Sequence, residues 1–215
     1  MSDSRIIADW PAPANIMAGT TLRNSRFALP AAAPQLNQVH GTTVVRADSE
    51  LFESGRPDAD AIVADKPGAI CVVRTADCLP ILFCSKDGLE IAAAHAGWRG
   101  LAAGIVEETI AAMRTPAHEL ISWFGPAISQ AAFEVGAEVR EAFLDADATA
   151  SAAFAQNHRG RWQANLYLLA SQRLRRAGVT GIHGGGLCTY RDAERFYSYR
   201  RNGATGRLVS FVYRA

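Results

Sequence analysis

This sequence lacks long hydrophobic runs, a targeting segment and an excess of charge of either sign. No apolar stretch reaches the roughly 18 residues that a membrane-spanning helix needs, and no basic segment followed by an apolar one opens the chain, so we expect no membrane span and no secretion signal. The net charge is only +1. Nucleic acid and anionic membranes are therefore not expected as main partners, because both favour a basic patch. We expect a cytoplasmic protein.

Cysteine is also scarce, and no Cys-x-x-Cys pair occurs. The four cysteines are Cys71, Cys78, Cys84 and Cys188, three of them in one apolar region. Without a secretion signal, free thiols or a metal ligand are more plausible than disulfides. With 215 residues, the chain is long enough to bury roughly 70% of its unfolded surface without such crosslinks. We find no internal repeat and predict one domain over residues 1–215.

Short apolar segments bounded by turn residues predict strands mixed with three amphipathic helices. The expected strands cover residues 35–46, 61–64, 69–74, 80–84, 89–94, 119–124, 182–188 and 208–213. One helix is expected over 101–113, a second is marked by Val135, Val139 and Phe143, and a third runs from Leu166 to Leu174. The first 30 residues favour an irregular entry, and 142–155 looks helical. The pattern predicts a single α/β domain with mixed β-sheets flanked by helices.

Three segments place a metal-ligand side chain beside a glycine, proline or aspartate near the end of an apolar run. They are Asn37–Gly41 with His40, Thr75–Pro80 with Cys78, and His95–Gly100 with His95. Catalytic zinc commonly has three protein ligands and keeps a fourth position for water or substrate. Taken singly, a histidine at a strand end or a cysteine in an apolar strand is more often structural. Spacing alone does not show that the three converge.

These segments resemble those of the YfiH-like family, the laccase-domain proteins once labelled multicopper polyphenol oxidases and now described as zinc-containing purine nucleoside phosphorylases with adenosine deaminase side activity. The resemblance covers the chain in order from about residue 35 to its end, and the His95–Gly100 and Ala76–Pro80 runs are its most specific parts. It rests on residues 38–41, 58–61, 75–80, 95–100, 125–129, 133–136, 188–189, 198–201 and 206–207. Residues 14–34 are shorter than the usual N-terminal region of the family, which limits the transfer of substrate contacts from there.

The resemblance implies a layered α/β sandwich and a metal bound by His40, Cys78 and His95, zinc first and copper as the alternative. It also implies a nucleoside and phosphate as ligands: adenosine, inosine and methylthioadenosine cleaved with phosphate, and adenosine deaminated. A metal-bound water with its pKa lowered to about 7 would supply hydroxide for deamination. The oligomeric state does not follow from the sequence.

Three other side chains are candidates for the reaction, each with a structural alternative. Arg200 or Arg201 would clamp phosphate or lie in solvent. Gln38 would hold a substrate group or satisfy backbone groups near the strand end. Asp77 would orient a ligand imidazole, since metal-bound histidines usually donate their second N–H to an oxygen, or cap local amides. Cys188 is either near the metal or a buried thiol.

Other functions use the same residues. Cys78 with His95 or His40 would be a nucleophile–base pair in a hydrolase, and an editing role in cell-wall precursor synthesis would fit it. Copper-dependent phenol oxidation is disfavoured, because the chain has five histidines and no His-x-His pair. A metal-carrying binding module would need a fourth ligand to close the site, and Cys188 would be the one to supply it.

Overall fold

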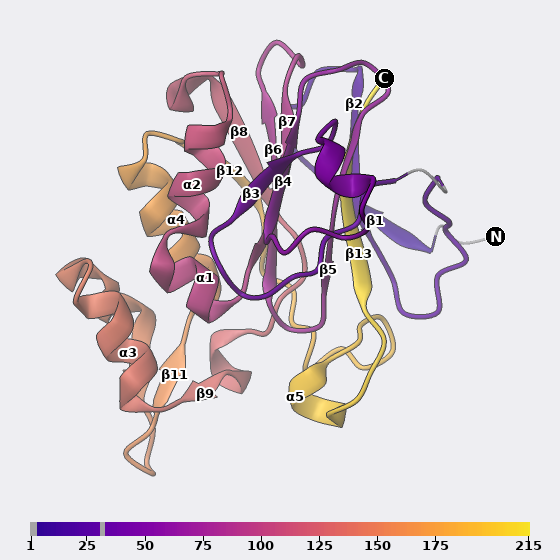
Figure 1. Ribbon diagram of the computed structural model, residues 1–215. Coiled ribbons are helices and arrows are strands. Elements are labelled where there is room, and N and C mark those ends of the chain that lie inside the picture. The colour runs from indigo at the N-terminus through magenta and orange to yellow at the C-terminus, as the bar shows by residue number, and fades with distance from the viewer. Residues whose placement is uncertain (1–3, 31–32) are drawn as a thin grey trace.

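The computed structural model describes residues 4–30 and 33–215, and its centre is a six-stranded mixed sheet (Figure 1). The strand order is β12 (Gly181–Gly184), β8 (Leu120–Phe124), β6 (Leu79–Ser85), β7 (Ile91–Ala96), β4 (Ala61–Ala64) and β3 (Val44–Arg46). Only the two outermost pairs, β12–β8 and β3–β4, are parallel. Within the described ranges, no helix has both the length and the apolar character to cross a membrane.

A second, antiparallel sheet packs against one face of the first. It has the order β1 (Arg5–Ile7), β2 (Ile16–Thr21), β13 (Leu208–Arg214) and β5 (Ile70–Thr75). The opposite face of the six-stranded sheet is covered by α1 (Trp98–Ala103), α2 (Ile105–Ala112) and α4 (Leu166–Arg176) (Figure 1). The predicted fold class, a single α/β domain with mixed sheets flanked by helices, is confirmed.

The two remaining groups of elements lie toward one end of the main sheets. A small sheet of β10 (Phe154–Gln156), β11 (Trp162–Ala164) and β9 (Glu134–Val135) lies with α3 (Ala137–Leu144), and α5 (Tyr199–Asn202) precedes β13 (Figure 1). This end of the molecule carries the segments that enclose the site described below.

The central strands are buried along their whole length because both faces of their sheet are covered. Every residue of β6 and β7 is buried. Small side chains at Ala92, Ala93 and Ala94 let the helices approach one face and the second sheet approach the other. Burial of this kind stabilises by about 25 cal/mol for each Å² of apolar surface removed from water, so the strand that carries His95 is held rigidly.

Several predicted elements differ from the structure. The expected helix over 101–113 begins at Trp98 and is divided at Gly104, whose φ of 109° only glycine adopts readily. The first 30 residues contain β1 and β2, so the expected irregular entry is wrong for the described part of that stretch; residues 1–3 lie outside it. Within 142–155, α3 ends at Leu144 and a 3₁₀ helix spans Ala148–Ala153. Of the extended stretch 35–46, only Val44–Arg46 is a strand.

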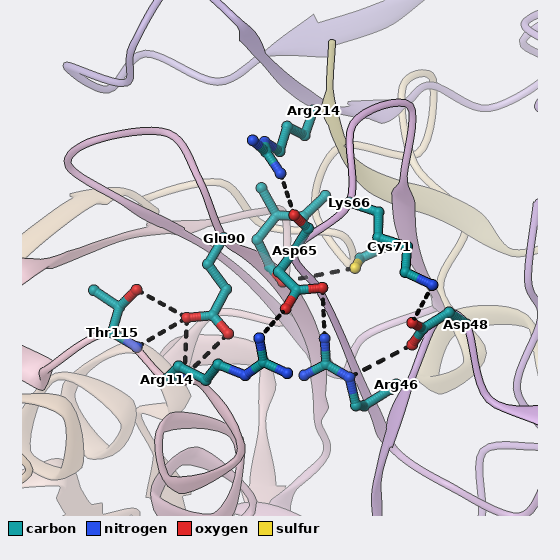
Figure 2. Close-up of polar contacts among 10 residues, drawn as sticks. Arg46, Asp48, Asp65, Lys66, Cys71, Glu90, Arg114, Thr115 and Arg214 are labelled. Carbon is teal, nitrogen blue, oxygen red and sulfur yellow. Dashed lines mark hydrogen bonds and ion pairs between the residues drawn. The ribbon is translucent and has the colours of Figure 1, made fainter.

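Polar contacts join the edge of the six-stranded sheet to the neighbouring elements (Figure 2). Asp65, which follows β4, forms ion pairs with Arg46 at 2.7 Å and Arg114 at 2.8 Å, and its carbonyl accepts a hydrogen bond from Arg214. These ion pairs are partly exposed, and such pairs contribute at most about 1 kcal/mol each. They fix the ends of strands rather than supply most of the stability.

Glu90 is the buried member of the same network (Figure 2). Its carboxylate accepts hydrogen bonds from the backbone N–H groups of Arg114 and Thr115 and from the Thr115 hydroxyl, all at 2.8–3.0 Å. The carboxylate therefore supplies hydrogen-bond acceptors to the backbone N–H groups just after α2, where the helix has ended and these groups have no helical partner.

We expect Glu90→Ala to lower the free energy of unfolding by about 2–4 kcal/mol, because two backbone donors and a hydroxyl lose a buried acceptor. Urea denaturation followed by circular dichroism measures this. Glu108→Ala, at an exposed position of α2, is the matched control and should change stability by less than about 0.5 kcal/mol. Equal effects of the two substitutions would contradict the role given to Glu90.

Candidate metal centre

His40, Cys78 and His95 converge, although they come from three separate segments. His40 lies in the loop before β3, Cys78 in the short connection from β5 to β6, and His95 in β7. One ligand atom from each residue lies within 4.8 Å of the others. The Cys78 Sγ and His40 Nε2 atoms are 4.0 Å apart, and the two imidazole rings meet edge to face with centroids 4.8 Å apart.

Asp60 holds two of these three ligands in place. Its buried carboxylate is 2.7 Å from Nδ1 of His95, so Nε2 of that ring is left to face the cluster. The same carboxylate accepts hydrogen bonds from the backbone N–H groups of Val39, His40 and Gly41 at 2.7–3.2 Å. One side chain thus orients one imidazole and fixes the loop that carries the other.

The backbone around the cluster is adapted to close packing. His40 has a φ of 62°, an uncommon conformation for a residue other than glycine, and the hydrogen bonds to Asp60 hold it there. A Cβ atom on Gly97 would lie 2.9 Å from the His40 ring and 3.1 Å from the Cys78 sulfur, and one on Gly100 would lie 2.7 Å from the Gly41 carbonyl. Glycine at both positions therefore lets the start of α1 approach the ligand loop.

The charges in the cluster favour a thiolate. Burial raises the pKa of Cys78, but hydrogen bonds from His40 and His95 and the charges of these rings outweigh it, and the pKa is about 6. Burial lowers the pKa of His95, whereas Asp60 and the thiolate raise it to about 9. Burial also raises the pKa of Asp60, and hydrogen bonds from His95, Gly41 and His40 bring it below its ordinary value. At neutral pH the metal-free cluster therefore holds a thiolate beside an imidazolium.

This donor set fits zinc. Tetrahedral zinc with bonds of about 2.3 Å to sulfur and about 2.0–2.1 Å to nitrogen would separate these two atoms by about 3.6 Å, close to the 4.0 Å between Cys78 Sγ and His40 Nε2. The metal needs a thiolate and neutral imidazoles, so its binding would release the His95 proton. Asp60 supplies the oxygen partner that a metal-bound histidine usually has.

The cluster opens into a cavity of about 610 Å³. This volume is within the range of small-molecule sites. Part of the lining is apolar, with Leu36, Ile128, Phe133 and Leu166, and Trp98 and Tyr199 add aromatic surface. The charged and polar lining consists of Gln38, Arg74, Thr75, Asp77, Arg99, Arg200 and Arg207 together with the three ligands. The cavity combines an apolar surface for a flat ring with guanidinium groups for an anion.

Of the predicted reaction residues, Arg200 lines the cavity and Arg201 does not. The Arg200 guanidinium donates to the Glu134 carbonyl at 3.0 Å and lies over the Phe133 ring. The guanidinium of Arg201 donates instead to the carbonyls of Thr189, Tyr190 and Phe196 and so fixes the loop before α5.

Gln38 lines the cavity, but its side-chain amide is hydrogen-bonded to the backbone of Arg74. Its nitrogen donates to the Arg74 carbonyl and its oxygen accepts from the Arg74 N–H, both at 2.8 Å. The side chain thereby takes the place of a neighbouring strand at the free edge of β5 and holds the His40 loop against that sheet. The backbone-satisfying alternative for Gln38 is the one found.

Asp77 has a different task from the one expected. The prediction that it orients a ligand imidazole is wrong, because its carboxylate accepts from the hydroxyls of Thr189 and Ser198 and from the backbone N–H of Arg200. Asp60 orients His95 instead. Sequence reasoning did not select Asp60, although it lies in the 58–61 segment of the resemblance, because two aspartates are present there and only the fold distinguishes them.

The other cysteines lie apart from the cluster. Cys188 accepts a hydrogen bond from the Ser129 hydroxyl at 2.9 Å. It does not belong to the metal-ligand group found among the described residues. Cys71 and Cys84 are buried in the core between the two sheets. No fourth protein ligand therefore closes the described cluster, which leaves its cavity side for a small molecule.

Comparison with known proteins identifies similar chains along almost the whole length. Residues 12–215 match a family model described as multi-copper polyphenol oxidoreductase laccase. Purine nucleoside phosphorylase YfiH of Escherichia coli is 51% identical over 185 residues, which are 86% of this chain and 75% of the relative. A purine nucleoside phosphorylase of Pseudomonas aeruginosa is 45% identical over 236 aligned positions, covering 95% of this chain and 96% of the relative.

The solved structures give the same result for the fold. A crystal structure of a Neisseria meningitidis protein superimposes with a TM-score of 0.92 at 43% identity and covers 98% of this chain and 99% of its own. The alignment with the Pseudomonas relative has more positions than the 215 residues of this chain, so that relative contains segments that this chain lacks.

We expect Asp60→Asn to weaken zinc binding about 10- to 100-fold, because the His95 ring loses a charged partner and the His40 loop loses its charged acceptor. Competition with a chelator of known affinity measures the dissociation constant. Asp58→Asn is the control: Asp58 is exposed, contacts the Asn37 side chain and lies only two residues away. Equal zinc affinity in the two variants would refute the assignment of Asp60.

Proposed function

The chain belongs to the family described as multi-copper polyphenol oxidoreductase laccase, and from this premise we propose that it is a zinc-dependent purine nucleoside phosphorylase. Its substrates are adenosine, inosine and methylthioadenosine, each cleaved with inorganic phosphate, and adenosine deamination is a side activity. The names of the Escherichia coli and Pseudomonas aeruginosa relatives support the phosphorylase activity.

One observation carries the proposal: a three-donor cluster lies in a cavity that is also lined by apolar side chains and by guanidinium groups without a carboxylate partner among the described residues. Phosphorolysis of a purine nucleoside needs each of these parts. The apolar side chains would accommodate the purine, arginine binds phosphate in a bidentate manner, and a metal ion held by the cluster would supply a cation beside them. A phosphate oxygen then forms a bond to C1′ while the bond from C1′ to the purine nitrogen breaks, and the purine leaves with the electron pair and takes up a proton.

The side chains of this cavity have separate tasks in the proposal. Arg200 binds the phosphate, and its position is fixed because its N–H and its guanidinium are hydrogen-bonded to Asp77 and to the Glu134 carbonyl. Asp77 is a positioning residue that ties the Arg200 segment to the Cys78 segment. Gln38 is likewise a positioning residue for the His40 loop. Zinc, when bound by His40, Cys78 and His95, supplies Lewis acidity at this end of the cavity.

Zinc is preferred to copper, and phosphorolysis to phenol oxidation, for a structural reason. A multi-copper oxidase needs several copper centres, and the described residues form a single group of three metal-ligand side chains. Catalytic zinc is usually held by three protein ligands and keeps a fourth position open, and the three donors of this cluster, with no fourth ligand among the described residues, match that count.

A second enzyme function is supported by the charges of the metal-free cluster. A thiolate at Cys78 with a pKa of about 6 beside a protonated His95 is the arrangement of a cysteine hydrolase. Editing of cell-wall precursors by amide hydrolysis would use this pair. Zinc occupancy separates the two functions, because a metal-bound thiolate is not free to attack a substrate.

The central test is phosphate-dependent release of hypoxanthine from inosine. Zinc-loaded protein, produced in a host without its own phosphorylase, should release hypoxanthine only when phosphate is present. We expect Cys78→Ala to reduce this rate at least 100-fold, and Cys188→Ser, at a thiol outside the cluster, to retain it. Undiminished activity of Cys78→Ala, or release without phosphate, would contradict the proposal.

The hydrolase alternative is tested by alkylation of Cys78 with iodoacetamide, located by peptide mapping. Because the thiolate is the reactive form, alkylation of the metal-free protein should be fast above pH 6 and should slow as the pH falls through about 6. Saturating zinc should slow it more than tenfold. Alkylation that zinc does not slow would favour the free nucleophile of a hydrolase.

A further inference from the structure

Four arginines line the cavity, and none of them has a carboxylate partner among the residues that the structure describes. They are Arg74, Arg99, Arg200 and Arg207. Elsewhere in the fold, arginines such as Arg46, Arg173 and Arg176 form ion pairs. Among the described residues that line the cavity, Asp77 alone carries a carboxylate, and both its oxygens are hydrogen-bonded to neighbouring protein groups. The Cys78 thiolate belongs to the metal-ligand cluster. The four guanidinium groups therefore have no ion-pair partner among these residues.

Two of the arginines, Arg99 and Arg200, lie on the helical side of the cavity. Both also line a neighbouring cavity of about 260 Å³, so they stand at the boundary between the two spaces. Arg99 lies over the Trp98 ring at 4.4 Å, and Arg200 lies over the Phe133 ring at 5.4 Å. Stacked in this way, the two guanidinium groups form the site for inorganic phosphate in the proposed reaction.

The other two, Arg74 and Arg207, belong to the sheet side. In the antiparallel pairing of β5 with β13, Arg74 is opposite Val209. Arg207 directly precedes β13 and lines the same cavity as Arg74. Strand geometry extended by one residue would place it diagonal to Arg74, at about 7–8 Å. The Arg207 side chain donates only to the carbonyls of Thr205 and Gly206, and that of Arg74 has no hydrogen-bond partner among the described residues.

Two like charges placed diagonally on a sheet repel each other. Arg74 and Arg207 are both exposed and both line the cavity, so a bound anion with several oxygen acceptors would reach both guanidinium groups and relieve this repulsion.

We propose that the preferred substrates carry a phosphate of their own and are purine nucleoside 5′-monophosphates. Arg74 and Arg207 bind the 5′-phosphate, while Arg99 and Arg200 bind inorganic phosphate. This inference rests on the proposed phosphorylase function. An oxygen of inorganic phosphate bonds to C1′, and the bond from C1′ to the purine breaks. The purine leaves with the electron pair and a proton is added to it, so the products are the free purine and ribose 1,5-bisphosphate.

The charge count supports two anions rather than one. Each phosphate group carries about −2 near neutral pH, so inorganic phosphate with an unphosphorylated nucleoside leaves at least two guanidinium groups without a counter-ion. A nucleotide together with inorganic phosphate brings about four negative charges to four arginines.

The test compares inosine with inosine 5′-monophosphate, which share base and sugar, on the full-length zinc-loaded protein. Hypoxanthine release with phosphate should give a kcat/KM at least tenfold higher for the monophosphate. Arg74→Gln and Arg207→Gln should each reduce that preference at least fivefold, whereas Arg200→Gln should raise the KM for inorganic phosphate with either substrate. Arg56→Gln, at an exposed position outside the cavity, is the matched control and should leave the preference unchanged.

A binding measurement gives a second readout that does not depend on turnover. By calorimetry without inorganic phosphate, the monophosphate should bind at least tenfold more tightly than inosine, and Arg207→Gln should remove this difference. Phosphate-dependent cleavage of inosine with no preference for the monophosphate, and equal binding of the two, would overturn this inference and leave the proposed function standing. Absence of phosphate-dependent cleavage of both compounds would overturn the proposed function and the inference together.

Discussion

The carboxylate of Asp60 makes the contacts on which the cluster of His40, Cys78 and His95 depends. It is buried, it faces Nδ1 of His95 at 2.7 Å, and it accepts the backbone N–H groups of the loop that carries His40. A buried carboxylate is stable only when it is paired and hydrogen-bonded, so the same contacts that make the site also make the burial of Asp60 tolerable. The core strands β4 and β7 hold Asp60 and His95 side by side, since the His95 N–H donates to the Asp60 carbonyl at 2.7 Å. The ligand geometry is thus built into the rigid centre of the fold.

Asp77 has the corresponding function for the opposite wall of the cavity. Its carboxylate joins the connection that carries Cys78 to the chain around Thr189, Ser198 and Arg200. Two aspartates, Asp60 beside the His95 imidazole and Asp77 beside the Arg200 segment, therefore connect distant parts of the sequence around one cavity. A substrate between them would meet fixed groups, which reduces the entropy lost on binding and supports catalysis by orientation.

The sequence was most informative where the local pattern and the tertiary structure agree. Apolar runs such as 61–64 correspond to strands that are buried on both faces, and the structure brings together the three candidate ligands His40, Cys78 and His95. The local pattern was misleading where the conformation of a single residue breaks an element. Gly104 divides the helix expected over 101–113. The sequence did not show that Asp60, rather than Asp77, orients the His95 imidazole, because both aspartates lie next to apolar runs. Only the strand pairing shows which carboxylate reaches His95. The sequence likewise does not show which arginines lack a carboxylate partner, because ion pairing is a property of the folded chain.

Anomalous scattering measured at the zinc absorption edge, on crystals of the zinc-loaded protein, tests the central claim most directly. The account predicts one strong peak about 2.3 Å from the Cys78 sulfur and about 2.0–2.1 Å from Nε2 of His40 and of His95, with the remaining coordination position facing the cavity. A metal bound elsewhere, or a site closed by a fourth protein ligand, would contradict it.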